Sequence, residues 1–110
     1  MLIDRLIISR KKLEDFCTRW QVEQLSVFGS AVRDDFSEQS DVDLLVAFTE
    51  TSDWGLFEHL QMKQELKELF DRNVDLITRR SLEQSRNILL RDEILNSARV
   101  LYSADEKAHV

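Results

Sequence analysis

Apolar and polar residues follow two different periods along the chain, and each period predicts a kind of element. Residues 3–20 and 54–70 repeat apolar side chains every three or four positions, which predicts two amphipathic helices. The apolar runs at 22–28, 42–48 and 74–78 are short and predict strands. This order of elements predicts an α/β fold, a small mixed β-sheet flanked by helices.

Each predicted helix has an apolar face that suits packing on a sheet. In the first helix this face holds Leu6, Leu13, Phe16, Cys17 and Trp20. In the second it holds Leu56, Leu60, Met62, Leu66, Leu69 and Phe70, with Lys63, Glu65, Lys67 and Glu68 on the wet side. Ser52 or Asp53 is the expected N-cap of the second helix. The basic cluster at 10–12 is interpreted as a solvated helix face rather than a partner contact.

The remainder of the chain continues the same alternation of elements. Residues 71–73 predict a turn, and the pattern from Arg79 onward is helical again, with Asp92 and Glu93 as an expected helix start. The apolar stripe of this region is expected to hold Ile88, Leu89, Leu90, Ile94, Leu95 and Ala98. Residues 100–102 predict a short terminal strand or a docking segment, and 103–110 a frayed tail.

Composition narrows the class of protein. A chain of 110 residues with 43% hydrophobic and 33% charged residues is typical of one soluble globular domain, here 1–110. Its net charge of −6 argues against direct binding of nucleic acid through a broad basic surface. No apolar run approaches the ~20 residues of a membrane span, and no signal pattern begins the chain. A single cysteine, Cys17, excludes an internal disulfide, and we expect a cytoplasmic protein.

The candidate chemistry lies between the first and second predicted strands. Asp41 and Asp43 open the second strand and are followed by the apolar run that ends at Phe48. Side chains alternate along a strand, so the two carboxylates share a face, about 7 Å apart at Cα for a rise of roughly 3.3 Å per residue. Two carboxylates on one face repel each other unless a cation lies between them. Carboxylate oxygens are ligands of Mg²⁺, which predicts a divalent metal here.

A phosphate-binding turn is predicted just before the same strand. Gly29 and Ser30 follow the first strand and resemble a strand-to-helix turn, whose free backbone N–H groups hold phosphate. Neither this pair nor the aspartates alone is specific, but their conjunction predicts a nucleotide site. Arg33 either reaches the phosphates or pairs with the acidic residues that follow it. Ser40 is expected only to help the strand begin.

A third carboxylate lies inside the third predicted strand. Asp75 and Ile77 alternate with Val74, Leu76 and Thr78. If this strand pairs beside the strand that carries Asp41 and Asp43, three carboxylates converge; the alternative is an aspartate that faces water. His59, on the second helix, is interpreted as a structural or surface residue rather than a general base.

These residues resemble the signature of the nucleotidyltransferases of the DNA polymerase β superfamily. The resemblance is closer to the minimal nucleotidyltransferases, small domains that pair with HEPN toxins in prokaryotic toxin–antitoxin systems. It rests on Phe28-Gly29-Ser30, Arg33, the run from Ser40 to Val46, the run from Val74 to Thr78 and the closing segment from Ile94 to Tyr102. It covers roughly residues 22–102 and implies a polymerase β-like fold.

The resemblance implies a mechanism and a partner. Asp41, Asp43 and Asp75 would be the catalytic, metal-binding triad, and Gly29, Ser30 and Arg33 would bind the nucleotide. The implied cofactor is Mg²⁺ or Mn²⁺, and the implied substrate is ATP. The implied activity is transfer of AMP to a hydroxyl, that of a tyrosine, in a cognate HEPN RNase toxin, which neutralises the toxin within a hetero-oligomer.

Two other functions stay open at this point. The chain could be an antitoxin that acts by binding alone, although an intact acidic triad argues against this because unused buried carboxylates cost stability. It could also adenylylate a small molecule such as an antibiotic. Enzymes of that kind usually carry a further helical domain, for which 110 residues leave no room.

Overall fold

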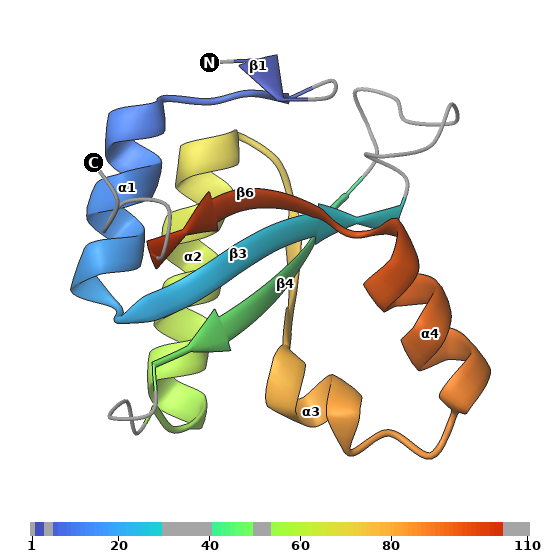
Figure 1. Cartoon of the computed structure of the whole chain (residues 1–110). Helices are drawn as coiled ribbons and strands as arrows, with labels where there is room; N and C mark the ends of the chain where they lie inside the picture. The colour runs from blue at the N-terminus through green and yellow to red at the C-terminus, as the bar shows by residue number, and fades with distance from the viewer. Residues whose placement is uncertain (1, 4–5, 30–40, 50–53, 105–110) are drawn as a thin grey trace.

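A four-stranded mixed sheet forms the centre of the chain in the computed structural model (Figure 1). The structure describes residues 2–3, 6–29, 41–49 and 54–104. The sheet has the order β5-β4-β3-β6, in which β4 and β5 are parallel and the other neighbours antiparallel. The strands are β3 (Val22–Phe28), β4 (Val42–Phe48), β5 (Val74–Thr78) and β6 (Arg99–Ser103). The predicted α/β class, the mixed sheet and the terminal strand are confirmed.

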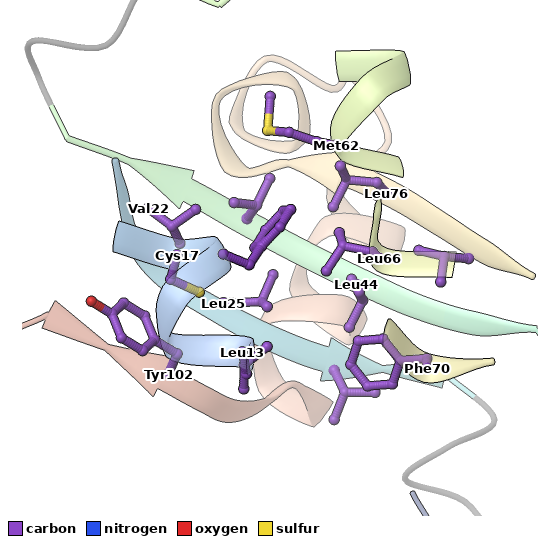
Figure 2. Packing of buried hydrophobic residues seen from close by; sticks show 14 of the residues in the cluster. Leu13, Cys17, Val22, Leu25, Leu44, Met62, Leu66, Phe70, Leu76 and Tyr102 are labelled. Carbon is purple, nitrogen blue, oxygen red and sulfur yellow. The ribbon is translucent and has the colours of Figure 1, made fainter. Parts of the chain in front are cut away.

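Helices pack on both faces of this sheet. They are α1 (Arg10–Arg19), α2 (Leu56–Phe70), α3 (Arg79–Glu83) and α4 (Ile88–Ser97). On one face, α1 and α2 enclose the main core, in which Leu13, Leu66 and Leu44 are almost fully buried (Figure 2). On the other face, a smaller cluster joins the sheet to α3 and α4. Across the described ranges, no helix has the length and apolar character that crossing a membrane requires.

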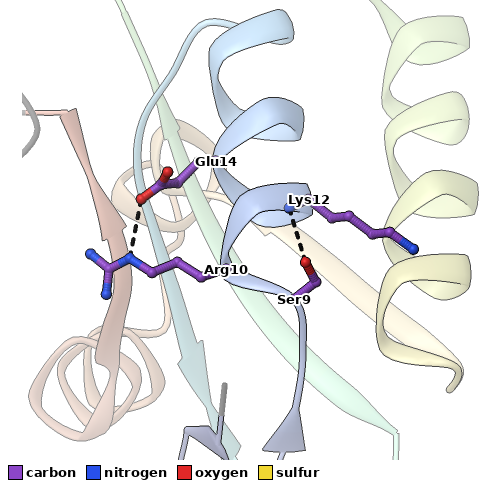
Figure 3. Close-up of polar contacts among 4 residues, drawn as sticks. All are labelled: Ser9, Arg10, Lys12 and Glu14. Atoms are coloured by element: carbon purple, nitrogen blue, oxygen red, sulfur yellow. Dashed lines mark hydrogen bonds and ion pairs between the residues drawn. The ribbon is translucent and has the colours of Figure 1, made fainter.

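The predicted helix over residues 3–20 is wrong in its first part. A short antiparallel pair, β1 (Leu2–Ile3) and β2 (Leu6–Ile7), precedes α1. Ser9 then caps the helix: its side chain accepts a hydrogen bond from the backbone N–H of Lys12 at 3.3 Å (Figure 3). A serine in extended conformation at this position satisfies a free N–H of the first turn, so the helix begins after it.

The second predicted helix is confirmed from Leu56 to Phe70, but its apolar face is narrower than expected. Leu56 and Leu60 are 76% and 55% exposed. The buried side chains form the single row Met62, Leu66 and Phe70. At 100° per residue, Leu60 lies about 120° around the helix from the middle of that row, so it faces away from the core. The capping position is Gly55, whose N–H donates to Glu58 at 3.0 Å, and the expected caps Ser52 and Asp53 lie outside the described residues.

The helical region after Arg79 is divided into two helices. Asn87 caps α4 by accepting from the N–H of Leu90 at 3.1 Å, so the expected helix start at Asp92 and Glu93 is wrong. The expected apolar stripe is also wrong in part, since Ile88, Leu89 and Leu90 are exposed and Ile94 is the buried residue of α4. The contact of α4 with the sheet is made by its second half: Ile94 packs with Leu82 of α3, and Leu95 lies partly buried against the same cluster.

Candidate active site

Two of the predicted carboxylates lie side by side on neighbouring strands. β4 and β5 are parallel, and Asp43 is in register with Asp75. Their neighbours Leu44 and Leu76 point into the main core, so the two aspartates point to the opposite face. Adjacent strands are about 4.8 Å apart, which places the two residues within reach of one ion. The predicted pairing of the third strand beside the second is confirmed.

Asp41 lies at the same end of the sheet. It directly precedes β4, where the N–H of Val42 donates to the carbonyl oxygen of Asn73 at 2.9 Å and ties the starts of β4 and β5 together. Asp41 and Asp75 are exposed, and both line one groove, whereas Asp43 is half-buried. All three predicted carboxylates are therefore found at the end where β4 and β5 begin.

Gly29 fits closely against one of these carboxylates. It directly follows β3 and has a φ of 71°, a left-handed conformation that favours glycine. Phe28 is in register with Asp43, and a Cβ on Gly29 would collide with the Asp43 carboxylate, lying 3.2 Å from its Cγ. The turn therefore requires glycine both for its conformation and for this contact. The other residues predicted to hold the nucleotide, Ser30 and Arg33, and also Ser40, lie outside the described residues.

The donor set suits a hard divalent cation. Within the described ranges, no three acidic, histidine or cysteine side chains are already gathered into a metal-binding cluster. Mg²⁺ usually takes one or two carboxylates and completes its shell with water and substrate phosphates, so a preformed cluster is not required. Asp43 and Asp75 are in register on neighbouring strands, and Asp41 lies two residues before Asp43.

A groove of about 590 Å³ opens beside the carboxylates, between α2 and the first residues of β5. Its lining consists of Asp41, Leu60, Lys63, Gln64, Lys67, Asn73, Val74 and Asp75. The volume is within the range of ligand sites. His59 belongs to the same helix but does not line the groove.

Sequence reasoning missed the two lysines of this groove. The sequence pattern predicts that Lys63 and Lys67 lie on the wet face of a helix, and both are exposed. Their place beside Asp75 depends on how α2 packs along β5. A signal was nevertheless present, because Leu60, Lys63, Gln64 and Lys67 follow the spacing of one helix face.

Comparisons with known proteins agree with this fold. The family profile described as "Nucleotidyltransferase domain" matches residues 9–101. The protein adenylyltransferase MntA of Thermococcus cleftensis is 35% identical over 81 residues, which are 74% of this chain and 78% of that protein.

Two solved structures are also similar. One is a protein provisionally described as a minimal nucleotidyltransferase, with a TM-score of 0.62 and 33% identity, covering 82% of this chain and 86% of the other. The second is a complex of a tri-AMPylated Shewanella oneidensis HEPN toxin with its MNT antitoxin. It has a TM-score of 0.59 and 17% identity over 91% of this chain and 74% of the other, and this likeness concerns the fold.

Proposed function

This chain belongs to the nucleotidyltransferase domain family, and from that premise we propose that it is a metal-dependent protein adenylyltransferase that neutralises a HEPN toxin. It would transfer AMP from ATP to a hydroxyl of the toxin, that of a tyrosine. The observation that carries the proposal is the register of Asp43 with Asp75, with Gly29 held against Asp43. The proposed location is the cytoplasm, which supplies ATP and keeps a thiol such as Cys17 reduced.

The names of the similar proteins support this choice of acceptor. The relative from Thermococcus cleftensis is named a protein adenylyltransferase. The Shewanella oneidensis complex joins an antitoxin of similar fold to a HEPN toxin that carries AMP groups. The groove beside Asp75 is open to solvent, which suits an acceptor that a second protein brings to the site.

In the proposed reaction, the oxygen of the acceptor hydroxyl attacks the α-phosphorus of ATP. A new phosphorus–oxygen bond forms, the bond to the β-phosphate breaks, and pyrophosphate leaves. Bound Mg²⁺ or Mn²⁺ would lower the pKa of the acceptor hydroxyl and neutralise charge on the phosphates. Asp41, Asp43 and Asp75 would hold that cation, and the carboxylate of Asp75 would take the proton of the hydroxyl.

Gly29 contributes to the proposed site because it has no side chain. Because it has no side chain, the backbone turn lies directly against Asp43. Backbone N–H groups at such a turn bind phosphate oxygens without adding a charge. We propose that the ATP phosphates lie here, with Ser30 and Arg33 as further ligands, so that the phosphates lie next to the carboxylates that hold the cation.

The direct test is the mass of the partner. The chain is incubated with ATP, Mg²⁺ and its HEPN toxin, and the mass of the intact toxin is measured by mass spectrometry. We expect the mass to rise by whole AMP units. The gain should disappear with a chelator and with the double variant Asp41→Asn, Asp43→Asn. A control with the same change in charge, Asp15→Asn with Asp92→Asn, removes carboxylates on α1 and α4 and should keep the gain.

The same experiment separates catalysis from binding alone. If the toxin loses its RNase activity with no change in mass, the proposed enzyme activity is wrong. The double variant would then silence the toxin as well as the unmodified chain does, and the function would be binding.

A further inference from the structure

One face of α2 forms a wall of the groove beside the acidic residues. Leu60, Lys63, Gln64 and Lys67 are spaced as i, i+3, i+4 and i+7, and all four line the groove. Asp41 and Asp75 line the same groove from the starts of β4 and β5. The groove thus has two ammonium groups on one element and two carboxylates on others.

These charges do not pair with each other. Within the described part of the chain, neither Lys63 nor Lys67 forms an ion pair, although α2 has one elsewhere, between Glu65 and Arg19 at 2.6 Å. Like charges four residues apart on a helix repel each other and destabilise the helix. An anion bound between the two lysines would remove that repulsion, as a cation would between the carboxylates.

The position of the groove indicates which substrate it serves. Gly29 contacts Asp43 from the β3 side, whereas the groove lies on the β5 side, at an edge of the sheet. We infer that this groove is the acceptor side of the active site and that Lys63 and Lys67 bind an anionic group next to the acceptor hydroxyl. This inference rests on the proposed function, because it takes the Gly29 turn as the phosphate side.

Leu60 completes the groove in a way that fits an aromatic acceptor. Its side chain is 55% exposed, and it lies one helical turn from Lys63 and Gln64. An apolar side chain beside two cations offers a surface for a tyrosine ring and charges for a neighbouring anion. That anion has two chemical sources: a carboxylate of the toxin segment, or the phosphodiester of an AMP already attached to the tyrosine.

Peptide binding tests the inference without any transfer step. Three short tyrosine peptides serve as probes: a neutral one, one with an adjacent aspartate, and one whose tyrosine already carries AMP. We expect NMR shifts at Lys63 and Lys67 with at least one anionic peptide and much weaker shifts with the neutral one. The acidic peptide identifies a carboxylate as the source, and the AMP-bearing peptide identifies the phosphodiester. Equal binding of all three peptides, or none, overturns the inference.

The double variant Lys63→Gln, Lys67→Gln, called the α2 variant, should lower the affinity for the favoured peptide by about tenfold. This is the effect expected from the loss of two exposed charge contacts. The matched control, Lys11→Gln with Lys12→Gln, makes the same change of charge on α1 and should leave binding unchanged. Calorimetry with ATP and Mg²⁺ adds a second criterion. If the α2 variant lowers the affinity for ATP by the same factor as the affinity for the peptide, the groove binds the nucleotide and the inference is wrong.

The toxin assay keeps this inference distinct from the proposed function. With the α2 variant we expect AMP transfer to need about tenfold more toxin for the half-maximal rate, or to stop after the first AMP, while the affinity for ATP is kept. If the unmodified chain transfers no AMP, the proposed function fails. If it transfers AMP and the α2 variant matches it in rate and in number of AMP units, the inference about the groove fails.

Discussion

The two faces of the sheet differ in how completely they are covered. Under α1 and α2, a continuous core includes Leu13, Leu25, Leu44 and Leu66, all 1% exposed or less. Among the described residues, the buried cluster under α3 and α4 consists of Phe28, Leu45, Leu82 and Ile94, and each keeps a few per cent of exposure. The carboxylates of Asp43 and Asp75 belong to this second face. A carboxylate on the first face would lose its hydration, so the less covered face is where charged groups can lie.

The largest expected effect concerns the charges of the less covered face. Asp75→Asn removes the proposed proton acceptor, and a general base contributes about 10²–10⁴-fold to a rate. We expect AMP transfer to fall by that factor, measured as AMP units per toxin over time. The free energy of unfolding should stay the same or rise slightly, because Asp75 is exposed and lies beside Asp43. A large loss of stability with transfer intact would make Asp75 a structural residue.

The second prediction compares the two faces through neighbouring residues of one strand. Leu44 is fully buried in the main core, and Leu45 is 6% exposed in the smaller cluster. Urea unfolding should show that Leu44→Ala costs about 4 kcal/mol and Leu45→Ala about 2 kcal/mol, since the cost depends on the cavity left behind. Equal costs would mean that both faces are packed alike.

The third prediction concerns the turn at the edge of the active site. Gly29→Ala places a Cβ where φ is 71° and where the Asp43 carboxylate lies. The backbone strain costs about 1–2 kcal/mol of unfolding free energy. The rate of AMP transfer should fall as well, because the new Cβ forces the Asp43 carboxylate to move. A loss of activity in the folded variant would distinguish Gly29 from a residue that only stabilises the fold. A variant of unchanged stability and activity would contradict the described turn.

Part of this arrangement could be predicted from the sequence because it is local. The runs at 22–28, 42–48 and 74–78 have the bounds of β3, β4 and β5, since each is apolar and ends at polar residues or a turn. The alternation within β5 placed Asp75 on the face opposite Leu76. The carboxylate pair then required only that β5 lie beside β4, which the register confirms. The roles of Asp41, Asp43 and Asp75 stay predictions.

The features that could not be predicted depend on contacts between distant segments. Leu60 is apolar but 55% exposed, because the row Met62, Leu66 and Phe70, and not the side of α2 that carries Leu60, packs on the sheet. The two lysines line the same groove as Asp75 only because α2 packs along β5. The start of α1 at Arg10 depends on the cap at Ser9 and on the strand pair before it, which an apolar pattern over residues 3–20 does not distinguish from a longer helix.

The smallest expected change in unfolding free energy is for a substitution on the solvent-exposed side of α4. Leu89 is 83% exposed, and Ile94 on the same helix is 7% exposed. Leu89→Ser should change the free energy of unfolding by no more than about 0.5 kcal/mol, because it removes little buried surface and little helix propensity. Ile94→Ala is the matched contrast and should cost about 2 kcal/mol, as its side chain packs in the smaller cluster. If Leu89→Ser costs more than Ile94→Ala in urea unfolding, α4 packs through its other side and the second face is more covered than described.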